Sequence, residues 1–429
     1  MAPVIVSITI FVVSLALILS NKMHRAIVAL AGAVIMVAAG LLLDFYTEAE
    51  AASHVDFNTL GLLLGMMLLV ALLEPTGFFE FLAVYVARIS RGNPVRLLIL
   101  LGAVTSVTSM FLDNVTTVVL IAPVTILICE ILGVSSQPYL LSEALLSNVG
   151  GVSTLVGDPP NILIASAAGF TFTDFLVKSL PIVLICWLVS LFLLLRLFRK
   201  ELSRPLLDKE ALLELNPREA LKDSRTARKV VIVTLAAILF FFLEELLHLR
   251  PAFVALAAAA TALVWIRPNF SETLKRVEWD ILLFFAALFV MVGGLSASGV
   301  LGYVSDLLIS LTGLSSLLLG ILLLWLIAIL SAVVDNVPIT IALIPVIHGL
   351  SAAGIPTEGL WWAMVFGAGF GGNGTIIGAT ANIVVSTVSS RTREPITPVI
   401  WSKRGLPVML ASLVTASILY VAAFFIFGW

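Results

Sequence analysis

The chain has 429 residues, of which 60% are hydrophobic and only 12% are charged, with a net charge of −2. Together with a mean hydropathy of +1.15, this composition leaves too little polar surface to coat a water-soluble globule. It therefore excludes a soluble protein and predicts one that lives in a lipid bilayer.

Apolar runs of the roughly 20 residues that a bilayer crossing needs recur along the chain, without the alternation of barrel strands. They predict an all-α polytopic membrane protein with about ten transmembrane helices and two re-entrant hairpins. The predicted elements of the first half are spans at 3–20, 26–43 and 59–74, a hairpin at 94–132, a broken crossing at 138–169 and a span at 177–195. Those of the second half are spans at 229–247, 252–266 and 279–295, a hairpin at 314–352, a broken crossing at 359–390 and a span at 405–427.

Lysine and arginine are confined almost wholly to five clusters, which hold 22 of the 24 basic residues and predict the cytoplasmic loops. The clusters are 22–25, 88–96, 196–229, 267–276 and 391–404. We therefore expect a plasma (inner) membrane protein with both termini outside and a cytoplasmic linker at 198–228, whose charges need no nucleic-acid partner. The acid-biased or uncharged connections at 44–56, 244–248 and 353–358 are expected outside. The segments 77–90 and 299–311 are predicted to lie along the membrane interface or to brace the hairpins.

The polar residues repeat, which is the strongest clue to function. Asp113-Asn114-Val115 returns 222 residues later as Asp335-Asn336-Val337, and Thr154-x-x-Gly157-x-x-x-Asn161 returns 221 residues later as Thr375-x-x-Gly378-x-x-x-Asn382. Because the first copy has an odd number of crossings, the second copy enters the membrane upside down. This predicts inverted repeats at 1–197 and 229–429, with scaffold helices at 1–74 and 229–295, and an alternating-access transporter.

Asp113 and Asp335 fall at the predicted hairpin tips, where an ionised carboxylate is costly. This position favours proton or cation coupling, with helix capping as the alternative. Asp158, whose counterpart is Ala379, is either a third proton carrier or a cap. Glu143 is expected at the membrane interface.

The glycines of the broken crossings let the backbone unwind around a cavity. Neutral donors and acceptors near them are expected to bind a small polar solute, although helix–helix hydrogen bonds are the alternative for any one of them. The predicted substrate-binding residues are Asn114, Thr116, Thr117, Thr154, Gly157, Asn161, Asn336, Thr340, Thr375, Gly378 and Asn382. Basic residues are absent from the predicted cavity, which disfavours a multivalent anion. Cys129 and Cys186 are expected to pack as small apolar side chains, and no catalytic residue, metal site or cofactor is predicted.

These motifs resemble the ion transporter superfamily, in particular the branch of arsenite permeases, sodium/proton antiporters and the melanosomal P protein. The resemblance is carried by the segments 111–117, 157–161 and 335–338 and spans essentially the whole chain. It implies a scaffold and a transport domain in each half, a site between hairpins and broken helices, and in many members a homodimer.

The leading hypothesis is proton-coupled efflux of arsenite or antimonite as the neutral trihydroxide, which asparagine and threonine can bind while an aspartate exchanges the proton. Sodium/proton antiport is the first alternative, and an anion carrier of the dicarboxylate type is the second. An intramembrane aspartyl protease fits poorly, because Leu155 stands where a Gly-x-Gly-Asp motif needs glycine. A channel does not need inverted broken helices. The chain has no phosphate-binding loop, so energy comes from a gradient or from a separate ATPase subunit.

Overall fold

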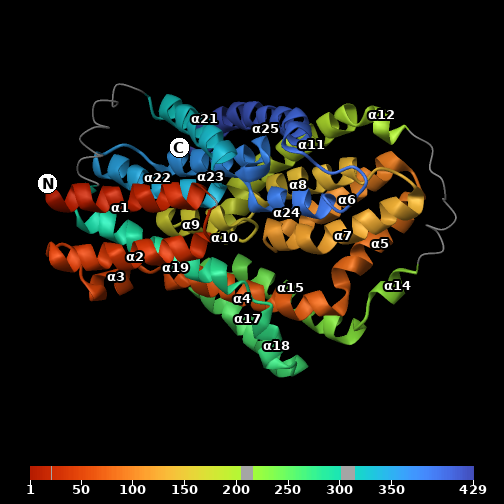
Figure 1. The fold of residues 1–429 in the computed structure, drawn as a ribbon, viewed down its shortest axis with the longest axis horizontal. Coiled ribbons are helices and arrows are strands. Elements are labelled where there is room, and N and C mark those ends of the chain that lie inside the picture. Colours follow the sequence, from red (N-terminus) through yellow and green to blue (C-terminus); the bar gives the residue numbers. More distant parts are fainter. Residues whose placement is uncertain (21, 204–215, 301–314) are drawn as a thin grey trace.

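A computed structural model describes residues 1–20, 22–203, 216–300 and 315–429, and every regular element within them is a helix (Figure 1). This confirms the all-helical fold. Most of the expected interface segment at 299–311 and the middle of the linker at 198–228 lie outside the described residues.

The helices of the first half are bounded as follows: α1 (Ala2–Leu19), α2 (Arg25–Leu42), α3 (Glu48–His54), α4 (Phe57–Leu73), η1 (Glu74–Thr76), α5 (Phe78–Ser90), α6 (Pro94–Ser109), α7 (Asn114–Leu132), α8 (Gln137–Gly151), α9 (Pro159–Ala168), α10 (Phe172–Asp174), η2 (Phe175–Ser179), α11 (Leu180–Leu197) and α12 (Arg199–Leu202). Those after it are α14 (Pro217–Ala220), α15 (Ser224–Phe242), α16 (Glu244–Leu247), α17 (Pro251–Ile266), α18 (Phe270–Lys275), α19 (Trp279–Ala297), α21 (Ser316–Val333), α22 (Asn336–Ala352), α23 (Glu358–Gly371), η3 (Gly372–Gly374), η4 (Ile376–Gly378), α24 (Thr380–Ser389) and α25 (Pro398–Phe427).

Among the described residues, seven helical segments are long and apolar enough to cross a membrane, and five shorter apolar helices accompany them. The short ones include α6, α22 and α24, which belong to the predicted hairpins and broken crossings. A hairpin arm or a half-helix needs less than a full crossing, so the short lengths agree with the predicted architecture.

The helices repeat with the same offset as the motifs. The hairpin arms α6 and α7 correspond to α21 and α22, and the broken crossing α8–α9 corresponds to α23–α24. Left-handed glycines stand after both second hairpin arms, Gly133 (φ 63°) after α7 and Gly354 (φ 82°) after α22. Glycine adopts this conformation without the steric cost that a side chain adds.

The two halves are interlocked through their hairpins. Each hairpin packs on the broken crossing of its own half, α6 on α8 and α21 on α23, but the second arm reaches into the other half, so that α7 contacts α24 and α22 contacts α9. In Figure 1 the hairpins lie toward opposite ends of the long axis, α6 and α7 on one side and α21 and α22 on the other. Their tips therefore approach each other in the middle of the molecule.

Loops predicted to face the same side of the membrane contact one another. Among the acidic loops predicted outside, Lys178 Nζ pairs with Glu358 Oε1 at 2.7 Å, and Ser166 bonds to Asp56. Lys178 is one of the few basic residues outside the five clusters. The loops predicted to lie outside are therefore close together at one end of the helix bundle.

The basic loops behave in the same way. Arg404 Nη2 pairs with Glu201 Oε1 at 3.0 Å, and Ser135 bonds to Glu394. Which of the two ends faces the cytoplasm stays a prediction from the basic residues. The predicted domain boundaries likewise stay predictions.

Candidate functional site

The first hairpin tip is built around the carboxylate of Asp113. Asp113 is the N-cap of α7 and accepts a hydrogen bond from the backbone N–H of Thr116 at 2.9 Å. The Thr116 hydroxyl also donates to this carboxylate and lies 3.2 Å from Glu278 Oε1, at the start of α19. The cap and the predicted site therefore coincide, and the threonine links Asp113 to a second carboxyl group.

The second hairpin tip has the same residues but different partners. Asp335 stands at the N-cap of α22 without a side-chain capping bond. Its Oδ2 instead receives hydrogen bonds from Arg25 Nη1 at 3.2 Å and Thr380 Oγ1 at 3.0 Å. The guanidinium also lies 5.5 Å from the centre of the Phe284 ring. This carboxylate thus already has a cation from the chain itself.

Asp158 connects the two halves. It precedes α9, is 1% exposed and makes no capping bond. Its Oδ2 accepts a hydrogen bond from the amide of Asn336 at 3.0 Å. The first broken crossing is thereby joined to the second hairpin tip.

A cavity of about 30 Å³ lies where these groups meet, with Arg25, Asp113, Asp158 and Asn336 among its lining residues. This is roughly the volume of one water molecule in the liquid. The expectation that basic residues are absent from the cavity is wrong, because Arg25 begins α2 at this point. Folding brings it from a cluster that the sequence assigned to a cytoplasmic loop.

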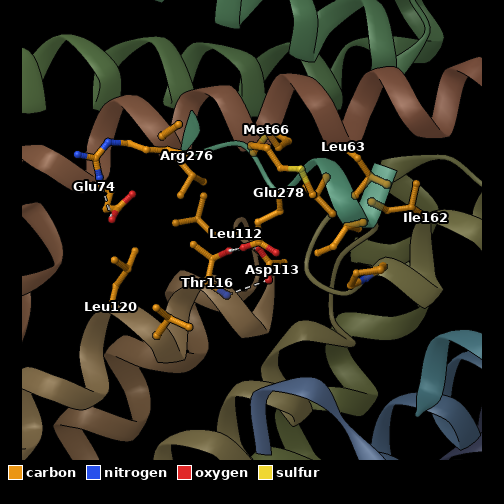
Figure 2. Close-up of a pocket in the computed structure, with 17 residues that line it drawn as sticks. Leu63, Met66, Glu74, Leu112, Asp113, Thr116, Leu120, Ile162, Arg276 and Glu278 are labelled. Atoms are coloured by element: carbon orange, nitrogen blue, oxygen red, sulfur yellow. Dashed lines mark hydrogen bonds and ion pairs between the residues drawn. The ribbon is translucent and has the colours of Figure 1, made fainter. Parts of the chain in front are cut away.

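A larger cavity of about 280 Å³ lies beside the first hairpin tip (Figure 2). Asp113 and Glu278 both line it, together with apolar side chains from α4 and α7 such as Met66 and Leu120. Arg276 and Glu74 also line it, and Arg276 Nη1 pairs with Glu74 Oε1 at 3.2 Å. Once Arg276 and Glu74 are counted as neutralising each other, Asp113 and Glu278 are the remaining ionisable groups on the lining, and they carry negative charge when they are deprotonated.

The threonine and asparagine of each broken crossing bind unwound backbone. Thr154 donates to the carbonyl of Met110, and Asn161 Nδ2 donates to the carbonyls of Gly151 at 3.0 Å and Thr154 at 2.8 Å. These bonds stabilise carbonyl groups that the helix leaves unpaired where it breaks.

The second crossing repeats the arrangement. Thr375 donates to the carbonyl of Ala332, and Asn382 Nδ2 donates to the carbonyls of Gly372 at 2.8 Å and Thr375 at 2.9 Å. In this conformation the four predicted residues shape the site through the backbone.

Gly157 and Gly378 allow close packing within the crossings. A Cβ on Gly157 would lie 2.5 Å from the carbonyl oxygen of Gly151, and one on Gly378 would lie 2.6 Å from that of Gly372. Neither residue lines a cavity described above. Their role is the close approach of two backbone segments.

Sequence reasoning missed a chain of buried amides between the crossings. Asn114 Nδ2 donates to Asn148 Oδ1 at 3.0 Å, and Asn148 Nδ2 donates to Asn373 Oδ1 and Asn382 Oδ1, each at 2.8 Å. The repeat did not reveal Asn148 or Asn373, because neither asparagine recurs in the other half. The position equivalent to Asn148 is Gly369, and the position equivalent to Asn373 is Val152. The available signal was an asparagine next to the glycines of each break, Asn148 before Gly150 and Asn373 between Gly372 and Gly374.

The remaining predicted residues differ in their surroundings. Thr340 donates to the carbonyl of Asn336 in its own helix at 2.8 Å, whereas the buried hydroxyl of Thr117 has no partner. Glu143 is 1% exposed, so it does not lie at a solvated interface as expected. Among the described residues, no group of three or more His, Cys, Asp and Glu side chains is arranged to hold a metal ion.

Comparisons with known proteins agree with this architecture. The family described as citrate transporter matches residues 15–367. An uncharacterized transporter of Mycobacterium tuberculosis is 41% identical over 430 residues, which cover 99% of this chain and all of the relative. The human P protein is 32% identical over 496 residues, which cover 96% of this chain and 59% of the P protein.

The fold also has a solved relative. The crystal structure of the YdaH transporter of Alcanivorax borkumensis aligns with 100% of this chain and 99% of its own, with a TM-score of 0.64 and 17% identity. Both the resemblance to the P protein branch and the predicted transporter fold are thereby confirmed. The chain is a multi-pass secondary transporter, not an enzyme, and it belongs to the citrate transporter family of the ion transporter superfamily.

Proposed function

We propose that this transporter exchanges a cation for protons across the plasma membrane by alternating access, with Asp113 and Glu278 as the coupling carboxyl groups. The observation that carries the proposal is their position: both line the 280 Å³ cavity and both contact the Thr116 hydroxyl. In the described part of the chain, neither forms an ion pair with lysine or arginine. Two neighbouring carboxylates repel each other, so such a pair takes up a proton or a cation.

The charge on the lining favours a cation over a free multivalent anion. Arg276 is already paired with Glu74, so a free tricarboxylate in this cavity would face Asp113 and Glu278 without a compensating positive charge. The name of the family therefore does not by itself supply the substrate. Sodium is the first cation to test.

Arsenite or antimonite export is the second candidate. A neutral trihydroxide donates hydrogen bonds, and the carboxyl oxygens of Asp113 and Glu278 are acceptors on the cavity wall. The asparagine and threonine side chains of the two broken crossings, on which the sequence-based hypothesis partly relied, are instead bonded to backbone in this conformation. Homodimer formation and an ATPase partner remain predictions.

The proposal is tested with the full-length protein in proteoliposomes that enclose a pH-sensitive dye. Sodium, potassium, arsenite or citrate is added outside, and proton movement is recorded. We expect sodium to drive proton movement in the wild type, and Asp113→Asn to reduce its rate by an order of magnitude or more because it can no longer exchange a proton.

Glu272→Gln is the matched control, because Glu272 is exposed and paired with Lys275 away from the cavity. It should behave like the wild type. Proton movement driven by arsenite without sodium would replace the first candidate with the second. A response to citrate alone, or wild-type exchange in Asp113→Asn, would overturn the proposal.

A further inference from the structure

A further buried carboxyl group lies in the interface between α7 and α8, outside the cavity of Figure 2. Glu143 of α8 is 1% exposed. Its Oε1 accepts a hydrogen bond of 2.5 Å from the Thr125 hydroxyl of α7, and its Oε2 has no partner. No lysine or arginine in the described part of the chain pairs with it.

Polar groups continue from Glu143 toward the first hairpin tip. Thr117 lies two turns before Thr125 on α7, and its buried hydroxyl also lacks a partner. Ser147 lies one turn after Glu143 on α8, and its hydroxyl is 3.5 Å from the carbonyl of Asn114. Two unpartnered buried polar atoms on these adjacent helices, Thr117 Oγ1 and Glu143 Oε2, are unusual, because buried polar groups are normally hydrogen-bonded.

The other end of this interface reaches a surface hollow. Cys129, one turn after Thr125, lines a hollow of about 560 Å³ together with Glu130 of α7 and with Ser135 and Arg393 from loops predicted to be cytoplasmic. Cys129 is also within electrostatic range of Glu143. Cys129 of α7 is thus the ionisable neighbour of Glu143, and Cys129 in turn interacts electrostatically with Glu130 of α7 and Tyr139 of α8.

The repeat shows that the fold does not need these polar groups. With the offset of 222 residues that relates the hairpin tips, Thr117 and Thr125 correspond to Ile339 and Ile347. With the offset of 221 that relates Gly133 to Gly354 and the broken crossings, Glu143 corresponds to Met364. All three counterparts are buried, at 7%, 0% and 0% exposure. In the second repeat these buried positions are therefore filled by apolar side chains. Packing alone does not explain why the first repeat has threonine and glutamate there.

We propose that Glu143 is a second proton-binding site, placed between the hollow at Cys129 and the Asn114–Asn148 amide pair. Its carboxylate takes up one proton to become the neutral acid and releases the same proton when the α7–α8 interface opens. The role in transport rests on the proposed proton coupling, but the binding of the proton does not. A carboxyl group without a neighbouring cation can occupy such a site as the neutral acid.

The direct test is infrared difference spectroscopy of the purified full-length protein during a pH titration. We expect a component of the protonated-carboxyl band, shifted in deuterium oxide, that disappears in Glu143→Gln and Glu143→Met but remains in Asp113→Asn. Thr125→Val keeps the carboxyl group and should shift this component, because a hydrogen bond is lost. Identical titrations of wild type and Glu143→Met would overturn the proposal.

Folding and transport are measured on the same variants. Glu143→Met should be at least as heat-stable as the wild type, since it reproduces the packing of Met364. In proteoliposomes it should retain sodium-driven proton movement with an altered pH profile. An unaltered profile would remove Glu143 from the transport cycle. A missing sodium response in the wild type, with the infrared component present, would instead reject cation–proton exchange and leave Glu143 as a proton site.

Discussion

The two hairpin-tip aspartates occupy equivalent positions but differ in what neutralises them. Asp113 caps its own helix and faces an open cavity, whereas Asp335 is bound by Arg25 and Thr380. The duplicated site has therefore diverged. One tip keeps a carboxylate available, and the other carries a cation supplied by the first scaffold helices.

The Arg25–Asp335 pair is predicted to stabilise this conformation. Its side chains are only 26% and 21% exposed, so Arg25→Gln leaves a poorly solvated carboxylate and should lower the free energy of unfolding by about 1–3 kcal/mol. Thermal and denaturant unfolding of the purified protein would measure this loss.

A double-mutant cycle supplies the control for that pair. Asp335→Asn should recover part of the loss caused by Arg25→Gln, because the unpaired charge is gone. Strictly additive effects of the two substitutions would show that the contact contributes nothing.

At the scale of elements, the broken crossings depend on pairs of glycines that face each other. Gly151 faces Gly157 in the first crossing, and Gly372 faces Gly378 in the second, with the backbone of the preceding hairpin arm close by. In the sequence, these glycines indicate a backbone that can unwind at this point. The structure adds that the neighbouring backbone leaves no room for a Cβ.

Alanine at Gly157 or Gly378 should therefore disrupt both stability and transport. We expect each substitution to lower the free energy of unfolding by about 2–3 kcal/mol, because backbone atoms cannot move aside as a flexible side chain can. Gly169→Ala is the control: it has a φ of 72° with nothing within 4 Å of the added Cβ, so it should cost about 1 kcal/mol of backbone strain. Unfolding curves would measure the stability of each variant, and proton exchange in proteoliposomes would measure its transport. Equal behaviour of all three variants would contradict the packing explanation.

At the scale of the whole molecule, the inverted repeats interlock around the site. Hairpin arms α7 and α22 each pack on the second half-helix of the opposite repeat, α24 and α9. A movement that separates one of these contacts can be mirrored at the other, which is the geometric basis of alternating access in such folds. The acidic loops contact one another, and so do the basic loops.

Cysteine labelling tests the orientation of these loops. Glu48→Cys lies in an acidic loop predicted outside, and Glu272→Cys lies in a basic loop predicted to be cytoplasmic; both positions are exposed. The native cysteines are buried, so background labelling should be low. We expect an impermeant maleimide to label position 48 in intact cells and position 272 in everted vesicles. Labelling of both from one side would refute the predicted topology.

Much of this architecture is local information and could be predicted from the sequence. Runs of apolar residues define helices, the paired Asp-Asn motifs mark the hairpin tips, and glycine and proline mark the breaks, because each of these effects acts over a few neighbouring residues. The constant offset between the motifs was then enough to align the two halves from the sequence alone.

The partners of the site were decided only by the tertiary structure. Arg25 reaches Asp335 across 310 residues, Asn336 reaches Asp158 across 178, and Thr116 reaches Glu278 across 162. No local pattern encodes such pairs, since they arise when helices from both repeats pack together. Hydropathy and the duplicated motifs determined that this protein is a membrane transporter built from two repeats. Long-range packing decided which of its duplicated carboxylates is paired and which remains open.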